Sequence, residues 1–148
     1  MSRAAVLLLV TLLSRGAPAV AAEPGLGTDV TATDRATAVK LMGPSTWQDA
    51  DPERDLSIAK GDLNGDGVPD YVTTINNPSF CGSSGCRIDV YLSTGKTYVE
   101  AADLLGASAR ADVAPGSTHG VRDLVLHGRQ DTRLVWDGKS YRAAGPAK

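Results

Sequence analysis

Residues 88–99 read Ile-Asp-Val-Tyr-Leu-Ser-Thr-Gly-Lys-Thr-Tyr-Val, and this stretch decides the fold class. Its first part alternates Ile88, Val90 and Leu92 with Asp89 and Tyr91, which is the two-residue period of a β-strand. The polar turn Ser-Thr-Gly-Lys follows, and a second strand-like run begins directly after it. Two such runs joined by a short glycine-containing turn are typical of a β-hairpin. The stretch therefore predicts antiparallel β-structure.

The same period recurs on both sides of this hairpin. It is present upstream in residues 56–58 and downstream in residues 124–126 and 134–136, while residues 70–75 are rich in β-branched and aromatic side chains, another strand signal. The last run is followed by the turn Asp-Gly-Lys-Ser and then by Tyr141, which predicts a second hairpin. The chain after residue 55 is therefore expected to consist mostly of strands.

One short helix is expected before the strands. Thr33 suits the N-cap position, and Asp34 places a negative charge in the first turn. A Gly-Pro pair at 43–44 ends the helix. Its apolar face carries Ala36, Val39 and Met42.

Residues 101–115 are rich in alanine and fit either a short helix around residues 102–105 or an irregular strand. The expected fold class is α+β, mostly β, with a small antiparallel sheet of hairpins and one N-terminal helix.

The first residues show the three parts of a secretory signal peptide. Arg3 is basic, residues 4–13 are almost entirely apolar, and small residues fill positions 19–22. The apolar run is shorter than the ~20 residues that span a membrane. We therefore expect a signal peptide at 1–22, a mobile leader at 23–32 and a single β-rich domain at 33–148, in a periplasmic or secreted protein.

The charge of the chain limits the classes of partner. The 148 residues carry a formal net charge of −2, and removal of Arg3 and Arg15 with the signal peptide takes it to −4. Nucleic-acid binding needs a basic patch, and so does attraction to an anionic membrane surface. We expect a monomer with a protein or cell-envelope partner, no nucleic acid, and no membrane insertion after cleavage.

Cys81 and Cys86 are the two cysteines of the chain. Export places them in an oxidising compartment, where disulfides persist. Their spacing differs from the Cys-x-x-Cys of a redox pair. A zinc site would need His119 and His127, whose spacing is poor for it. The pair therefore predicts a structural disulfide.

Residues 61–70 read Gly-Asp-Leu-Asn-Gly-Asp-Gly-Val-Pro-Asp. Calcium takes about six to eight oxygen ligands, and the glycines permit the tight turn that such a loop needs. Without a cation, side-chain oxygens so closely spaced would repel one another. An ordinary Asp/Asn/Gly turn is the alternative. The expected calcium ligands are the side chains of Asp62, Asn64, Asp66 and Asp70 and the carbonyl of Val68.

This loop is not an EF-hand, because its twelfth position is Thr73 instead of a bidentate glutamate. It resembles the Asp-x-Asn-x-Asp-Gly-x-x-Asp calcium loop of FG-GAP and VCBS repeats, which lies between two β-strands. The resemblance implies calcium binding by the four matching side chains. Those repeats usually recur to build propellers, whereas the loop occurs once here.

A larger part of the chain, residues 55–142, resembles a group of small exported bacterial proteins of unassigned function. Their pattern combines the loop with Cys-Gly-Ser-x-Gly-Cys at 81–86, His-Gly-x-x-Asp-Leu at 119–124 and Trp-Asp-Gly-Lys-x-Tyr at 136–141. This resemblance implies a family and a compartment, and it implies no activity.

A catalytic set can be written from Ser117, His119, Asp123 and His127, but any chain of this length allows that. Neither Gly-x-Ser-x-Gly nor His-Glu-x-x-His occurs, and geometry defines a triad. We therefore expect no enzyme but an exported calcium-binding module that contacts a protein or the envelope. The alternative is a small inhibitor or immunity-like protein that blocks an exported enzyme such as a lysozyme, with residues 82–85 as its inserted loop.

Overall fold

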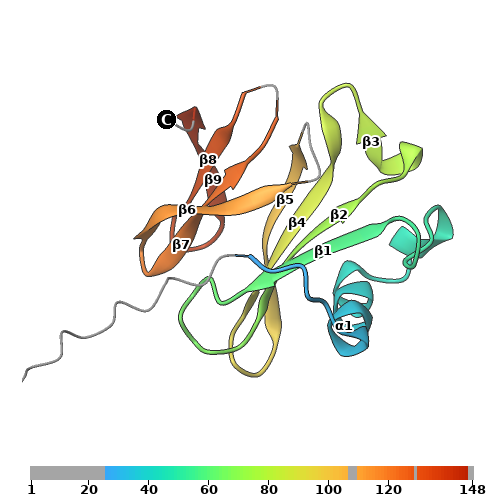
Figure 1. Cartoon of the computed structure of the whole chain (residues 1–148), viewed down its shortest axis with the longest axis horizontal. Helices are drawn as coiled ribbons and strands as arrows, with labels where there is room; N and C mark the ends of the chain where they lie inside the picture. The colour runs from blue at the N-terminus through green and yellow to red at the C-terminus, as the bar shows by residue number, and fades with distance from the viewer. Residues whose placement is uncertain (1–25, 107–109, 129, 147–148) are drawn as a thin grey trace, which may run out of the picture.

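The computed structural model describes residues 26–106, 110–128 and 130–146 (Figure 1). The expected signal peptide, and residues 23–25 of the expected leader, lie outside these ranges. The fold class is confirmed as α+β, mostly β, and the described residues form antiparallel strands and one α-helix. The strands form two sheets where a single sheet was expected, as the green and yellow strands and the orange and red strands of Figure 1 show.

The first sheet, called sheet A, is organised around its longest inner strand. The strand β4 (Gly85–Ser93) pairs with β2 (Asp70–Ile75) and with the short β3 (Cys81–Gly82) along one edge. Along its other edge it pairs with β5 (Tyr98–Gly106), while β1 (Leu56–Gly61) pairs with β2.

The first predicted hairpin is confirmed as β4 and β5. Leu92 pairs with Val99 and Ser93 with Tyr98, and the Thr94 N–H donates to the Thr97 carbonyl over 2.8 Å. The register shifts by a bulge between Val90 and Tyr91. β5 continues to Gly106, so residues 102–105 are strand and not helix.

The second sheet, called sheet B, is a meander of four strands in chain order. These are β6 (Ala111–Thr118), β7 (Val121–Leu126), β8 (Thr132–Trp136) and β9 (Tyr141–Pro146). The second predicted hairpin is confirmed as β8 and β9, in which Trp136 pairs with Tyr141.

The helix α1 (Ala32–Met42) is capped by Thr31, so the expected N-cap at Thr33 is wrong. The Thr31 hydroxyl accepts from the Asp34 N–H over 3.2 Å, and the Asp34 carboxylate accepts from the Thr31 N–H over 2.8 Å. This reciprocal capping box needs an acceptor three residues after the cap, and Asp34 stands at that distance from Thr31. Two short 3-10 helices, Thr46–Gln48 and Pro78–Phe80, lie in the connections.

Within the described ranges, no helix is both long enough and apolar enough to cross a membrane.

Sheet A separates two hydrophobic cores, because neighbouring side chains of a strand point to opposite faces. Tyr71 and Tyr91 face a core that α1 covers with Ala38 and Met42. Val72 and Val90 face the second core, which lies between the two sheets. Sheet B contributes to this second core through Val121, Leu124, Leu126, Leu134 and Tyr141.

The segment before α1 is attached to sheet A. Gly27 pairs with Lys60 of β1 through two backbone hydrogen bonds of 2.7 and 2.9 Å, and Leu26 packs against the core between the sheets. Residues 26–32 were expected as part of a mobile leader. Their contacts place the start of the domain earlier than residue 33.

Candidate metal-binding site

The expected calcium loop connects β1 to β2, and the pair Gly61 and Asp70 closes it. Gly65 and Gly67 have φ values of 77° and 78°, the left-handed region that glycine adopts without strain. The loop therefore lies between two antiparallel strands, and its glycines stand where the backbone reverses.

In the exposed part of the loop, carboxylate and amide oxygens accept hydrogen bonds from backbone N–H groups and so hold its turns. Asp62 accepts hydrogen bonds from the N–H groups of Gly65 and Gly67 over 2.7 and 2.9 Å. Asp66 accepts from the Val68 N–H over 2.8 Å. Such side-chain to backbone bonds are typical of Asx turns. Because an ionised carboxylate has about four acceptor positions, they leave capacity for a cation.

Asp70 lies at the base of the loop and is fully buried. Its two oxygens accept from the N–H groups of Leu63 and Ser93, each over 2.6 Å. Burial raises the pKa of Asp70 to about 6 against the opposing effect of these two bonds, and the charges of Asp66 and Asp62 raise it further. The buried carboxylate is thus held by neutral backbone donors, and the charges of two loop carboxylates act on it.

Asn64 joins the loop to the end of β4. Its side-chain N–H donates to the Ser93 carbonyl over 2.7 Å, and its side-chain oxygen accepts from the Asp66 N–H over 3.1 Å. Asn64 and Asp70 therefore hold Ser93 from both sides of its peptide unit.

The five expected ligand residues share one loop because they are close in sequence, but among the described residues a different set of carboxylates approaches closely enough to share a metal ion. Asp89, Glu100 and Asp103 each place one oxygen within 4.8 Å of the others. The sequence does not indicate this group, because Asp89 has the position of an ordinary polar residue in an alternating strand. Its proximity to Glu100 and Asp103 depends on the β4–β5 register.

The predicted disulfide is confirmed. Cys81 and Cys86 are bonded, and they also pair across β3 and β4. Gly82, Ser83 and Ser84 at the tip of this ring are exposed. The inhibitor hypothesis would insert this tip into an enzyme, and that role stays a prediction.

The residues considered for catalysis are engaged in separate contacts. His119 Nδ1 lies 2.9 Å from the Trp136 carbonyl. The buried Asp123 accepts from Arg133 Nη2 over 2.6 Å. His127 lies between two carboxylates, those of Asp112 and Asp131, at 2.8 and 3.0 Å. These contacts tie strands and turns of sheet B together.

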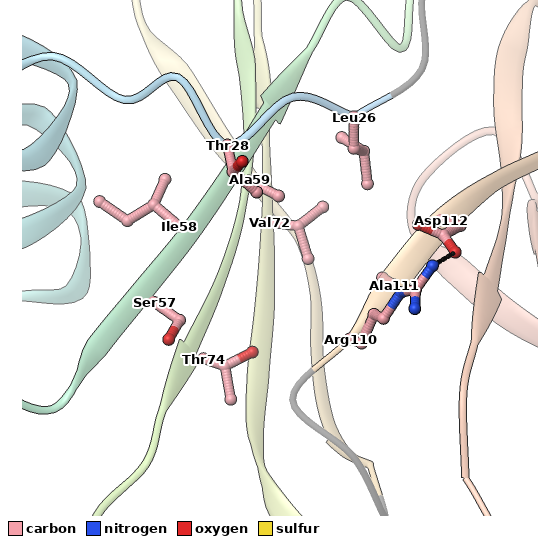
Figure 2. Close-up of a pocket in the computed structure, with 10 residues that line it drawn as sticks. All are labelled: Leu26, Thr28, Ser57, Ile58, Ala59, Val72, Thr74, Arg110, Ala111 and Asp112. Atoms are coloured by element: carbon pink, nitrogen blue, oxygen red, sulfur yellow. Dashed lines mark hydrogen bonds and ion pairs between the residues drawn. The ribbon is translucent and has the colours of Figure 1, made fainter.

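A cavity of about 190 Å³ lies between sheet A and the beginning of β6 (Figure 2). Its wall is largely apolar, with Leu26, Ala59 and Val72 on one side. On the other side Figure 2 shows Arg110 paired with Asp112, over 2.8 Å. Ligand pockets usually enclose about 300–1,000 Å³, so this cavity is small for an organic ligand.

Comparison of the chain with protein-family models, with curated proteins and with solved structures gives no match.

Proposed function

We propose that this chain is an exported module that binds calcium through the loop at residues 62–70 and contacts a protein or cell-envelope partner. Asp70 carries the calcium part of the proposal. Its fully buried carboxylate accepts from two neutral backbone N–H groups, and burial, with a smaller contribution from Asp66 and Asp62, raises its pKa. A cation beside the three carboxylates would offset both the lost hydration and the mutual repulsion.

The chemistry of the donor set suits calcium. Carboxylate, amide and carbonyl oxygens are hard ligands, which favour calcium over softer metals. Magnesium demands a stricter octahedron and gives up its waters reluctantly, so it should bind this loop more weakly. The proposed ligands are those of the sequence prediction: Asp62, Asn64, Asp66, Asp70 and the Val68 carbonyl.

Export is supported by the signal-peptide pattern at residues 1–22 and by the disulfide, because disulfides persist mainly in oxidising compartments.

Thermal melting of the exported protein, in chelator and in calcium, tests the proposal. Extracellular calcium modules bind at about 10⁻⁴ to 10⁻³ M, so ~5 mM calcium should add about 1–2 kcal/mol to the free energy of unfolding. For a domain of this size the melting temperature should rise by several degrees. Magnesium at the same concentration should produce a much smaller rise.

The matched variants are Asp66→Ala and Asp51→Ala. Asp66 is exposed, so its loss should abolish the calcium shift and leave the fold intact. Asp51 is also exposed and accepts from the N–H groups of Glu53 and Arg54, but it lies outside the loop. Asp51→Ala should retain the full shift. An unchanged melting curve for the wild type, after verified removal of bound metal, would reduce the loop to an acidic turn.

A further inference from the structure

The carboxylates of Asp89, Glu100 and Asp103 form a cluster on sheet A, apart from the calcium loop. Asp89 lies on β4 directly opposite Asp103 of β5, and Glu100 stands just before the bulge on β5. The Asp89 side chain is fully buried, whereas the Glu100 and Asp103 side chains are 50% and 61% exposed. The cluster therefore has one buried end and one end open to solvent.

The spacing of the three oxygens matches the size of a hard cation. One oxygen from each side chain lies within 4.8 Å of the other two. Calcium–oxygen distances are about 2.4 Å, so two ligands on opposite sides of one ion lie up to about 4.8 Å apart. The three oxygens can therefore share an ion without movement of the backbone.

Two buried oxygens beside the cluster have no partner among the described residues. Asp89 Oδ1 accepts from Arg87 Nε over 2.9 Å, but Asp89 Oδ2 is buried without a hydrogen bond. The Thr73 hydroxyl is also fully buried and unbonded, and Thr73 pairs with Asp89 across β2 and β4. Paired residues of antiparallel strands point to the same face. Buried polar atoms rarely lack a partner, so two adjacent ones indicate a ligand.

Arg87 neutralises only part of this charge. Its Nε lies 3.6 Å from Asp103, its Nη2 lies 3.8 Å from Glu100, and its one short contact is with Asp89. Three carboxylates and one guanidinium leave a local charge of −2, which one divalent cation balances. Ligating carboxylates are commonly hydrogen-bonded on their other oxygen, as Arg87 does for Asp89.

We propose that Asp89, Glu100 and Asp103 form a divalent-cation site on β4 and β5, with the Thr73 hydroxyl on its buried side and Arg87 orienting Asp89. An all-oxygen donor set selects hard ions, so the site takes calcium or manganese. Water completes the coordination at the exposed end.

Paramagnetic line broadening by Mn²⁺ tests this site directly. Substoichiometric Mn²⁺ is added to the ¹⁵N-labelled exported protein, and the backbone amide signals are followed residue by residue. The amides of residues 89 and 100–103 should broaden, and excess calcium should restore them. Mn²⁺ broadens signals beyond its own ligands, and Ser93, which Asp70 contacts, lies on the same strand as Asp89. The titration is therefore repeated on Asp66→Ala, in which the loop is disabled, so that failure of this site and failure of the calcium loop are distinguishable.

Exposed ligands supply the variants, because their replacement leaves the buried contact between Arg87 and Asp89 in place. Glu100→Gln and Asp103→Asn should each weaken Mn²⁺ binding at the cluster at least about tenfold and leave broadening of the loop unchanged. Asp66→Ala should weaken Mn²⁺ broadening of the loop and leave broadening at the cluster unchanged. Asp49→Asn, an exposed charge change without a role in either site, should alter neither.

The proposal fails if millimolar Mn²⁺ leaves the amides of residues 89 and 100–103 sharp. It also fails if the amide signals of residues 89 and 100–103 broaden as strongly in Glu100→Gln and Asp103→Asn as in the wild type. Equal broadening at other exposed acidic residues would likewise contradict a specific site.

Discussion

Buried aspartates in this molecule differ in the charge of their partners. Burial raises the pKa of Asp34, but bonds from Lys60, Thr31 and Tyr71 outweigh it and hold that pKa well below its usual range. Asp70 has only neutral partners, and the single guanidinium beside Asp89 does not compensate its burial, so both carboxyls have a pKa raised to about 6. At the scale of one residue, burial of these two charged carboxylates lowers the stability of the folded state.

That destabilisation predicts a pH dependence for the calcium-free protein. The pKa of about 6 in the folded state lies above the 3.8 of the unfolded chain, so between about pH 4 and 6 the folded state binds more protons. The free energy of unfolding should therefore rise as pH falls, by about 1 kcal/mol for each of Asp70 and Asp89 between pH 7 and 5. Urea unfolding in chelator at pH 5, 6 and 7 measures it.

Asp89→Asn separates this effect from other titrations. The asparagine keeps an oxygen for Arg87 and removes the ionisable group, so the slope of stability against pH should become flatter. A slope equal to that of the wild type would contradict the assignment to Asp89.

Among the elements, α1 depends on its first turn. Thr31 and Asp34 satisfy each other's backbone N–H groups, while Asp34 also accepts from Lys60 and Tyr71 of the neighbouring strands over 2.9 and 2.8 Å. The cap therefore fixes both the start of the helix and its position on sheet A.

Thr31→Ala should lower the free energy of unfolding by about 1 kcal/mol, because the Asp34 N–H loses its acceptor. Thr33→Ala is the matched control, since the Thr33 side chain is exposed inside the helix. Its effect should stay within about 0.5 kcal/mol. Equal losses for the two variants in urea unfolding would rule out the cap at Thr31.

At the scale of the whole molecule, the loop proposed to bind calcium joins the two sheets. Leu63 is 1% exposed and packs in the core between them. Its carbonyl accepts from the Arg122 N–H of β7 over 2.7 Å, while its own N–H donates to Asp70. A cation that ordered the loop would therefore also stabilise the packing of sheet B on sheet A.

Leu63→Ala should lower the free energy of unfolding by about 2–5 kcal/mol, because it leaves a cavity between the sheets. Leu105→Ala removes the same atoms from a side chain that is 63% exposed and should cost less than about 0.5 kcal/mol. Urea unfolding of both variants measures the difference. Similar costs would show that Leu63 does not hold the sheets together.

The sequence alone determined the local features of this protein. The period of residues 88–92, the two turns after Leu92 and Trp136, and the disulfide are confirmed because each depends on residues close together in the chain. The N-cap is equally local, but the expectation of Thr33 was wrong, because the reciprocal bonds with Asp34 place the cap at Thr31. The five expected ligands share one loop for the same reason of proximity, and calcium binding there stays a prediction.

Features that depend on pairing between distant segments became visible only in the three-dimensional structure. The strands divide into two sheets because β5 and β6 pair with different partners, and no residue pattern states that choice. Likewise, Asp89 meets Asp103 and Glu100 through a register that one bulge shifts, and Thr73 reaches the same face from β2. A shift of one residue would turn these side chains to the opposite face, so the cluster is a property of strand register, which is set by burial on both faces of sheet A.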